Sequence, residues 1–376
     1  MNVSDFDFDL PADLIAQDPP AERGTSRLLA LDRSSGRITH HQFGDLPSLL
    51  NPGDVIVVND TRVFPARLIG RRLPGGGAAE CFLVKPLEAP HKGVPYESRD
   101  QTQTGLPPCE SDRLRDEETW VALVHPGQRL RTGSRMVFEG DARRLQAEVT
   151  GMHFHGRRTV RLWTDDGTSV RDTVDVLGHV PLPPYIKRND AAADRERYQT
   201  VYARERGSIA APTAGLHFTP ALLAALAGRG IEKLSITLHV GYGTFQPIRV
   251  ERVEEHEMDP EHYEVSADTA AALAAAKRDG RRIIAVGTTS TRTLESLAID
   301  ATGEVQPGNG ETALFIHPGH RFKLVSGLVT NFHLPRSSLV MLVSAFGGTD
   351  HVRAAYRDAI AKGYRFYSYG DAMLVL

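Results

Sequence analysis

Residues 282–298 read Arg-Ile-Ile-Ala-Val-Gly-Thr-Thr-Ser-Thr-Arg-Thr-Leu-Glu-Ser-Leu-Ala, and this stretch decides the fold class. Arg282–Val286 is an apolar run typical of a buried strand, and Thr289–Ala298 has the character of a helix that begins soon after a glycine. Leu314–Ile316 follows as a further predicted strand. A strand, a helix and another strand in this order predict a largely parallel sheet that is covered by helices.

The same order of elements is found in other parts of the chain. Val55–Val58 is a second apolar run, and residues 234–240 carry apolar side chains at every second position, as a half-buried strand does. Thr219 and Pro220 predict the N-cap and first turn of a helix over residues 221–227. Ser266 predicts the N-cap of the alanine-rich helix that follows it. Both ends of the chain therefore belong to one α/β domain.

The helical period disappears between about residues 67 and 163. Short strand-like runs, such as Trp120–Val124 and Thr159–Trp163, are separated there by glycine and proline turns, which predicts a small β-barrel. We therefore expect a discontinuous α/β catalytic domain, residues 1–66 and 164–376, with a helix-covered and mainly parallel sheet, and an inserted β-barrel domain, residues 67–163. Within the barrel, residues 88–119 are polar and rich in proline, so we expect a flexible surface loop.

Composition restricts the class of protein. Cys81 and Cys109 are the two cysteines among 376 residues, and their spacing suits neither a zinc site nor a redox motif. The N-terminus lacks the basic start and apolar run of a signal peptide, and no apolar stretch is long enough to span a bilayer. We expect a cytoplasmic protein with no membrane contact and no bound metal.

Charge is unevenly distributed along the chain. The formal net charge is −3, yet Trp120–Trp163 contains eight arginines and three acidic residues. Such a basic region can contact nucleic acid phosphates. The alternative is that it is one of two solvated faces of opposite charge, since Glu251–Glu264 is strongly acidic.

The first motif that could carry chemistry is Ala211–Phe218, Ala-Pro-Thr-Ala-Gly-Leu-His-Phe, placed just before the predicted helix at Thr219. It brings together the hydroxyl of Thr213, the flexible backbone of Gly215 and the imidazole of His217, which can act as an acid or a base near neutral pH. The alternative is a turn whose histidine caps or packs.

A second motif, Leu238–Phe245, reads Leu-His-Val-Gly-Tyr-Gly-Thr-Phe and runs from a strand into two glycines. Glycines let the backbone approach a ligand closely. The third glycine of a dinucleotide fingerprint is absent and no helix follows directly, so a nicotinamide cofactor is not expected. A bulge or a hairpin turn is the alternative.

The third motif, Gly287–Glu295, has a strand before it and a helix after it, so hydroxyl groups and helix-start amides face one spot. A carboxylate, a phosphate or ribose hydroxyls can bind at such a spot. No lysine follows the glycine as a P-loop requires, so hydrolysis of a nucleoside triphosphate is not expected. The alternative is an ordinary helix cap with Arg292 and Glu295 paired on the helix surface.

The fourth motif, Thr330–Pro335, ends a further strand, and ligands of open α/β sheets collect beyond the carboxyl ends of strands. Asn331 can form hydrogen bonds with a base, Phe332 can stack and His333 can transfer a proton. Each of them can equally be a buried turn residue. Tyr364–Asp371 adds aromatic side chains near the C-terminus.

Together these motifs resemble, in the same order along nearly the whole chain, the S-adenosylmethionine:tRNA ribosyltransferase-isomerase family. The resemblance also includes Asp13–Gln17, Asn59–Arg62, Gly178–Arg188, Tyr198–Tyr202 and Tyr367–Met373. The sequence departs from the family pattern locally. Asp259 stands where the family commonly has a histidine, and the 88–119 segment is longer than expected.

The resemblance implies that the ribosyl group of S-adenosylmethionine is transferred and isomerised onto 7-aminomethyl-7-deazaguanine at the tRNA wobble position. The products would be epoxyqueuosine in tRNA, adenine and methionine, with no metal or other cofactor. The positive sulfonium acidifies the adjacent 5′ carbon, so a base can remove a proton there while an acid assists the departure of adenine. We expect the chain to act as a monomer on S-adenosylmethionine and tRNA.

The resemblance also implies roles for individual residues. The acid or base candidates are His217, His239 and His333, with Asp60 and Asp371 behind them. The substrate-binding candidates are Thr213, Gly215, Phe218, Tyr242, Gly243, Thr288, Thr289, Ser290, Arg292, Asn331 and Phe332. The candidates for tRNA binding are Arg62, Arg67, Arg129, Arg131, Arg157 and Arg158. A sugar or nucleotide transferase, a conventional methyltransferase and a non-catalytic RNA-binding protein are the rival functions.

Overall fold

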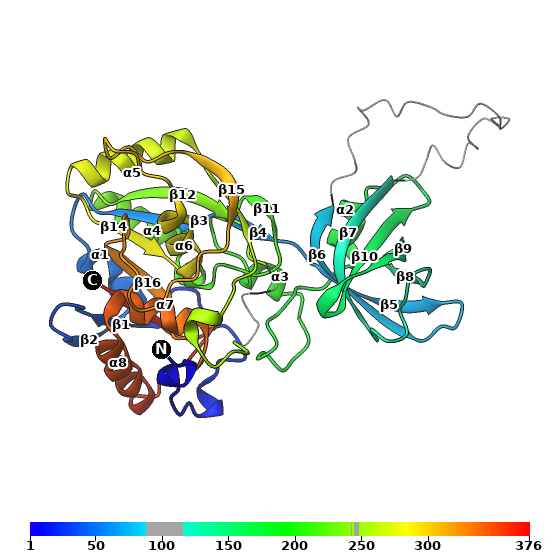
Figure 1. The fold of residues 1–376 in the computed structure, drawn as a ribbon, viewed down its shortest axis with the longest axis horizontal. Coiled ribbons are helices and arrows are strands. Elements are labelled where there is room, and N and C mark those ends of the chain that lie inside the picture. Colours follow the sequence, from blue (N-terminus) through cyan, green and yellow to red (C-terminus); the bar gives the residue numbers. More distant parts are fainter. Residues whose placement is uncertain (88–115, 242, 244–247) are drawn as a thin grey trace. The chain divides into compact units, whose positions relative to one another are not determined.

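The structure is a computed structural model that describes residues 1–87, 116–241, 243 and 248–376. The chain forms two compact units, Met1–Val63 with Leu182–Leu376, and Phe64–Pro181 (Figure 1). The second unit continues past Trp163, the expected end of the barrel, because helix α2 (Val170–Leu177) packs against the barrel strands.

The first unit is built on one sheet to which, among the described residues, nine strands contribute. Their order across the sheet is β15 (Gly308–Thr312), β13 (Glu261–Val265), β12 (Glu232–Leu238), β3 (Val55–Asn59), β14 (Ile283–Val286), β16 (Gly327–Asn331), β17 (Ala372–Val375), β1 (Arg27–Leu31) and β2 (Ile38–Gln42). A small parallel pair, β4 (Thr61–Val63) with β11 (Glu205–Ser208), lies outside it.

The centre of this sheet is parallel. Strands β12, β3, β14 and β16 all run in the same direction, and β17 is parallel to β1. The pairs β15–β13, β13–β12, β16–β17 and β1–β2 are antiparallel. The expected helix-covered sheet is confirmed, and its parallel part is the centre of a mixed sheet, with antiparallel pairs toward both edges.

Alternation along the central strands divides the core into two layers. In β3, Val55 and Val57 belong to one hydrophobic cluster, while Ile56 and Val58 belong to the other. Helices α5 (Ala267–Arg278), α6 (Thr288–Ser296), α7 (Ser338–Gly347) and α8 (Thr349–Ala361) pack on the first cluster; α1 (Leu46–Leu49) and α4 (Pro220–Gly228) pack on the second. Helix α3 (Asp194–Arg197) is a single short turn.

Both predicted helix caps are confirmed. The Thr219 hydroxyl accepts a hydrogen bond from the amide of Leu222 at 3.1 Å, and the Ser266 hydroxyl accepts one from the amide of Thr269 at 3.2 Å. These side chains satisfy amides that have no acceptor inside the helix.

The predicted strand at Leu314–Ile316 is wrong. The strand of this region is β15, which ends at Thr312. The carbonyl of Leu314 accepts a hydrogen bond from the Arg292 guanidinium at 2.9 Å instead of pairing with a neighbouring strand. The apolar side chains that suggested a strand pack against the core from a loop.

The second unit contains a closed antiparallel barrel, as expected from the loss of helical period. Its strands, in order around the barrel, are β10 (Arg157–Thr164), β7 (Asp116–His125), β6 (Ala78–Leu87), β5 (Arg67–Leu73), β8 (Arg135–Gly140) and β9 (Arg143–Met152). Alternate residues are fully buried along several of these strands, for example Leu145, Ala147 and Val149 in β9.

The predicted loop and the two cysteines are only partly within the described residues. Most of the predicted 88–119 loop lies outside them, and so does Cys109, whereas residues 116–119 belong to β7. Cys81 is buried, and burial raises the pKa of its thiol to about 12. None of the helices in the described part of the chain is long and apolar enough to cross a membrane.

Candidate functional site

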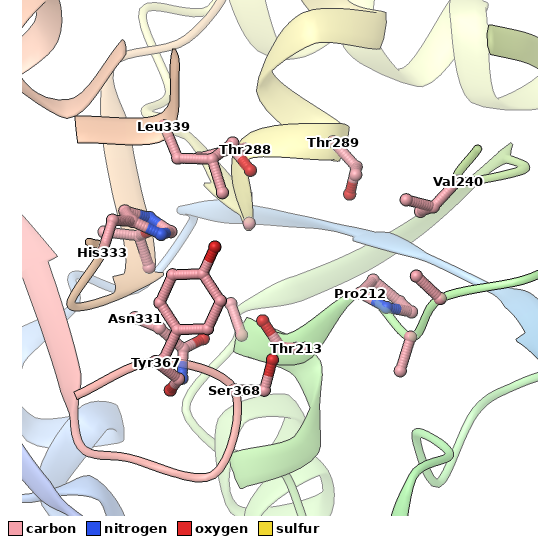
Figure 2. Close-up of a pocket in the computed structure, with 15 residues that line it drawn as sticks. Pro212, Thr213, Val240, Thr288, Thr289, Asn331, His333, Leu339, Tyr367 and Ser368 are labelled. Carbon is pink, nitrogen blue, oxygen red and sulfur yellow. The ribbon is translucent and has the colours of Figure 1, made fainter. Parts of the chain in front are cut away.

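A pocket opens in the first unit beside the carboxyl ends of strands β14 and β16. Its empty volume, including space open to solvent, is about 520 Å³. Figure 2 shows side chains from several elements converging on it. The lining residues are Ala210, Ala211, Pro212, Thr213, Ala214, Val240, Gly287, Thr288, Thr289, Thr330, Asn331, His333, Leu339, Tyr367 and Ser368.

Sheet topology explains why these segments meet. Strands β14 and β16 are parallel neighbours, so the loops that follow them leave at the same edge of the sheet. Strand β17 is antiparallel to β16, with Asn331 opposite Ala372, so the loop that precedes β17 reaches that same edge. This loop carries Tyr367 and Ser368 into the pocket.

Hydrogen bonds that link Asn331, His217 and Ser26 hold the Asn331 side-chain amide in one orientation. The carbonyl of Tyr367 can only accept, so the Asn331 Nδ2 at 3.0 Å donates to it. The second Nδ2 hydrogen is directed at Nε2 of His217, 3.1 Å away, which must therefore be the acceptor. The remaining His217 nitrogen, Nδ1, carries the proton and lies 2.6 Å from the Ser26 hydroxyl.

The other end of the Asn331 amide has no partner. Asn331 is 2 % exposed, and its Oδ1 makes no hydrogen bond with any residue that the structure describes. A buried acceptor without a partner costs about 1–3 kcal/mol, so it is conspicuous beside a pocket. A ligand with an N–H or O–H group would satisfy it.

His217, although predicted as an acid or base, is committed to these hydrogen bonds. It is buried, it contacts the Phe43 ring at a centroid distance of 4.9 Å, and it is not among the lining residues of this pocket. Burial lowers the pKa of His217 to about 4, so the imidazole is neutral near pH 7. Both ring nitrogens of His217 are engaged in hydrogen bonds, with Ser26 and Asn331.

His333 lies in the pocket and has a free nitrogen. Its Nε2 is 2.8 Å from the Thr330 hydroxyl, and its Nδ1 has no hydrogen-bond partner among the described residues. Burial lowers the pKa of His333 to about 3. A neutral imidazole with an available nitrogen can accept a proton from a ligand.

Tyr367 was not predicted as a site residue, although its motif was noted. Its φ of +74° is rare for a residue with a side chain, and its ring stands edge-on to His333 at a centroid distance of 6.5 Å. Figure 2 shows its hydroxyl directed into the pocket, on the side of Thr288. Burial raises the pKa of this hydroxyl to about 12, so it stays protonated. The approach of this loop to β16 depends on the antiparallel β17, which no local pattern reveals.

The start of helix α6 supplies the hydrogen-bond donors expected of the third motif. Gly287, with a φ of +91°, turns the chain from β14 into the helix, and Thr288 and Thr289 line the pocket. The first amides of a helix have no acceptor inside it and carry partial positive charge. Ser290 points elsewhere, because its hydroxyl donates to the Val286 carbonyl at 2.8 Å.

Arg292 is buried away from the pocket. Its guanidinium pairs with the buried Glu261 and donates to the carbonyls of Leu314 and Thr312. The alternative pairing with Glu295 does not form either, because Glu295 accepts hydrogen bonds from three backbone amides, those of Lys323, Leu324 and Val325.

His239 and Asp60 do not line the pocket. His239 Nδ1 is 2.8 Å from the Thr61 hydroxyl, and burial, assisted by His262, lowers the pKa of His239. Asp60 accepts a hydrogen bond from Thr237 at 2.7 Å and pairs with Arg204 at 3.0 Å. Burial raises the pKa of Asp60, which Thr237 and Arg204 partly counteract.

Four further candidates have structural contacts. Asp371 accepts from the Arg27 guanidinium at 2.8 Å and from the amide of Arg365. Phe218 and Phe332 are fully buried in the two core clusters. At Gly215, a Cβ atom would overlap the hydroxyl of Tyr202, which explains the glycine by packing.

Tyr242 lies outside the described residues. Gly243 is next to Asp259, since a Cβ on this glycine would come within 2.8 Å of an Asp259 carboxylate oxygen. Asp259 is the position where the resemblance led us to expect a histidine.

The arginines predicted to bind tRNA have different environments. In the first unit, Arg62 is exposed. In the second unit, Arg129 and Arg131 are exposed, whereas Arg67 pairs with Glu80 at 2.9 Å. Arg158 is only 7 % exposed. Arg157 is partly buried.

No group of three or more His, Cys, Asp or Glu side chains that could hold a metal ion occurs within the part of the chain that the structure describes.

Comparison with known proteins identifies the family. The family model described as "Queuosine biosynthesis protein" matches residues 3–375. A protein of Anaeromyxobacter sp. strain Fw109-5, named S-adenosylmethionine:tRNA ribosyltransferase-isomerase, is 50% identical over 100% of this chain and 99% of its own length. A protein of the same name from Symbiobacterium thermophilum is 49% identical, and both chains are covered completely.

Among solved structures, the crystal structure of S-adenosylmethionine tRNA ribosyltransferase from Thermotoga maritima matches with 35% sequence identity and a TM-score of 0.52. The match covers 99% of this chain and 100% of that one. The resemblance inferred from the ordered motifs is thereby confirmed. The chain belongs to the queuosine biosynthesis protein family, whose curated relatives carry the name S-adenosylmethionine:tRNA ribosyltransferase-isomerase.

Proposed function

We propose that this chain transfers and isomerises the ribosyl group of S-adenosylmethionine onto 7-aminomethyl-7-deazaguanine at the wobble position of tRNA. The products are epoxyqueuosine in tRNA, adenine and methionine. The names of the relatives support both substrates. A tRNA substrate fits the expected cytoplasmic location, and we propose that the chain acts as a monomer.

One observation supports this donor most directly. Asn331, whose Oδ1 has no partner among the described residues, and the amino-terminal turn of α6 both line the pocket. The first requires a donor, such as an amino group, and the second favours an anion, such as a carboxylate. S-adenosylmethionine carries a carboxylate, an α-amino group and the adenine amino group.

The pocket residues suggest a division of chemical roles. The sulfonium acidifies the 5′ carbon of the ribose, and His333, whose Nδ1 has no hydrogen-bond partner among the described residues, is the base that removes a proton there. The Tyr367 hydroxyl is protonated, points into the same pocket and is the hydrogen-bond donor there. His217 acts through Asn331, which it holds in place.

The tRNA is expected to use other surfaces of the chain. Arg62 of the first unit and Arg129 and Arg131 of the second are exposed cations that can contact phosphates. Arg157 belongs to the same group of barrel arginines.

The test is to incubate the purified protein with S-adenosylmethionine and with tRNA that carries the aminomethyl-deazaguanine base, then to analyse nucleosides and small molecules by mass spectrometry. Adenine, methionine and epoxyqueuosine should appear in equal amounts. Methylated RNA with S-adenosylhomocysteine would show a methyltransferase instead. A folded protein that binds tRNA but releases no adenine would be a binding protein.

A matched pair of variants links the activity to the pocket. Asn331→Ala should release adenine at least about tenfold more slowly at low S-adenosylmethionine concentration, in keeping with the loss of a buried hydrogen bond. Asn309→Ala changes an exposed asparagine of β15 and should match the unmodified protein.

A further inference from the structure

Three loops lie at one end of the barrel. Neighbouring strands of the barrel are antiparallel: β7 with β6, β6 with β5, β5 with β8, β8 with β9 and β9 with β10. The loops that join β5 to β6, β7 to β8 and β9 to β10, residues 74–77, 126–134 and 153–156, therefore lie at the same end. Hydrogen bonds hold the 126–134 loop against the start of β10: the Arg158 guanidinium donates to the carbonyls of Gly127 at 3.2 Å and Leu130 at 3.3 Å.

The loops at this end of the barrel carry one sign of charge. The three loops and their flanks, residues 74–77, 126–134 and 152–158, contain no aspartate or glutamate, although the whole chain has a net charge of −3. Arg129 and Arg131 are exposed and form no ion pair with another residue that the structure describes. By contrast, Arg144 on the β8–β9 hairpin, at the opposite end, pairs with Glu139.

The same end exposes apolar side chains. Phe154 is 89% exposed and Met152 is 53% exposed, the two most exposed large apolar residues in the described part of the chain. The turn that carries Phe154 is ordered by a hydrogen bond from the amide of His153 to the carbonyl of Arg157 at 2.9 Å. The His153 ring is in turn held 2.7 Å from the Thr159 hydroxyl.

An exposed aromatic ring among cations has a specific chemical fit. A base stacks on the face of an aromatic side chain, and arginines contact the phosphates beside it, which is how proteins hold unpaired nucleotides. An acidic protein partner could pair with the arginines, but it would not explain why the Phe154 ring is 89% exposed. An unpaired RNA nucleotide can both stack on the ring and bring its phosphates to the arginines.

We propose that this end of the barrel binds an unstacked nucleotide of the tRNA, with Phe154 stacking on the base and Arg129 and Arg131 contacting adjacent phosphates. The proposal rests on the proposed function, since it takes tRNA as the partner. Arg158, which was predicted to contact tRNA, instead holds the 126–134 loop against the start of β10.

The experiment measures tRNA affinity of the full-length protein as a function of salt concentration. Phe154→Ala should weaken binding by about 5- to 100-fold with little change in salt dependence, because a stacked base is lost. Phe154→Trp should bind as the unmodified protein does. The double variant Arg129→Gln with Arg131→Gln should lower the slope of log affinity against log salt by about 1.4, at about 0.7 for each phosphate contact.

Control variants change similar residues elsewhere in the same unit. Arg144→Gln removes a half-exposed arginine at the opposite end of the barrel, and Val176→Ala shortens a half-exposed apolar residue of α2. Neither should alter affinity or slope. Equal losses in these controls, or full affinity in Phe154→Ala and in the arginine double variant, would overturn the proposal.

Adenine release, measured on the same proteins, separates this proposal from the proposed function. If the unmodified protein releases adenine with modified tRNA and the Phe154 and arginine variants do so with an unchanged KM for tRNA, the surface is wrong and the function stands. If the unmodified protein binds tRNA through this surface but releases no adenine, the function is wrong and the surface stands.

Discussion

The neighbours of Asn331 fix its side-chain amide so that both hydrogens of Nδ2 are used and Oδ1 is left without a partner beside the pocket. Asn331→Asp keeps an oxygen at that point but replaces Nδ2 by a second oxygen, opposite the Tyr367 carbonyl and His217 Nε2. These contacts become repulsive unless His217 is protonated. We therefore expect weaker binding of S-adenosylmethionine near pH 7 by about tenfold or more, with partial recovery as the pH is lowered.

Titration calorimetry of Asn331→Asp across pH 5–8 measures this effect. Asn309→Asp is the control for adding a carboxylate at an exposed position. An affinity that is the same at all pH values would mean that His217 does not sense residue 331.

The two buried histidines also make the stability depend on pH. Burial lowers the pKa of His217 to about 4 and that of His333 to about 3, from an ordinary value near 6.5. Between these values the unfolded chain binds more protons than the folded chain. The free energy of unfolding should therefore fall as the pH decreases from about 6.5 to about 4, by up to about 1.4 kcal/mol per pH unit for each imidazole.

Urea unfolding at several pH values, compared between the unmodified protein and His333→Gln, isolates one of these contributions. The variant should lose less stability on acidification. His351→Gln changes a partly exposed histidine of the same unit and should keep the full slope. If His333→Gln and His351→Gln gave the same pH dependence, His333 would not be neutral in the folded state.

Helix α6 is held by a buried ion pair as well as by apolar contacts. Arg292 and Glu261 are 4% and 3% exposed, and the pair joins the helix to strand β13. Removal of one partner leaves a buried charge uncompensated, so Arg292→Met should destabilise the first unit by about 3–5 kcal/mol. The exposed pair of Arg278 and Glu304 offers a control, since Arg278→Met should cost less than about 1 kcal/mol.

Denaturant unfolding measures both variants, and Arg292→Met combined with Glu261→Met should recover much of the loss because no charge is then left unpaired. Equal costs for Arg292→Met and Arg278→Met would argue against a structural role for the buried pair and would leave Arg292 available for a substrate.

Local patterns predict the elements well where the signal lies in neighbouring residues. The strand at 282–286, the helix that follows it and the caps at Thr219 and Ser266 are of this kind. Contacts between segments that are distant in sequence cannot be predicted from such patterns. The approach of Tyr367 to the pocket requires β17 to run against β16, and the pairing of Arg292 requires β13 to lie beside the helix. Neither relation is encoded in spacing, so Tyr367 was missed and Arg292 was expected to face a ligand.

At the scale of the whole molecule, the first unit has a core of its own. Both hydrophobic clusters of its sheet draw all their residues from 1–63 and 182–376. The chain is also anchored where it leaves this unit, since the Gln199 side chain donates to the carbonyl of Val63 at 2.6 Å and accepts from its amide at 3.1 Å. Among the described residues, the inserted segment contributes no side chain to either cluster.

A deletion variant in which a glycine- and serine-rich linker replaces residues 64–181 should therefore fold and unfold cooperatively. It should bind S-adenosylmethionine within about threefold of the full-length protein, because every residue of the pocket is retained. Its affinity for tRNA should fall, and the slope of log affinity against log salt should decrease by at least as much as in Arg129→Gln with Arg131→Gln. Calorimetry with S-adenosylmethionine and salt-dependent tRNA binding measure the two outcomes separately. A deletion variant that bound tRNA with full affinity would assign recognition to the first unit, whereas one that failed to unfold cooperatively would show that the barrel is needed to complete its fold.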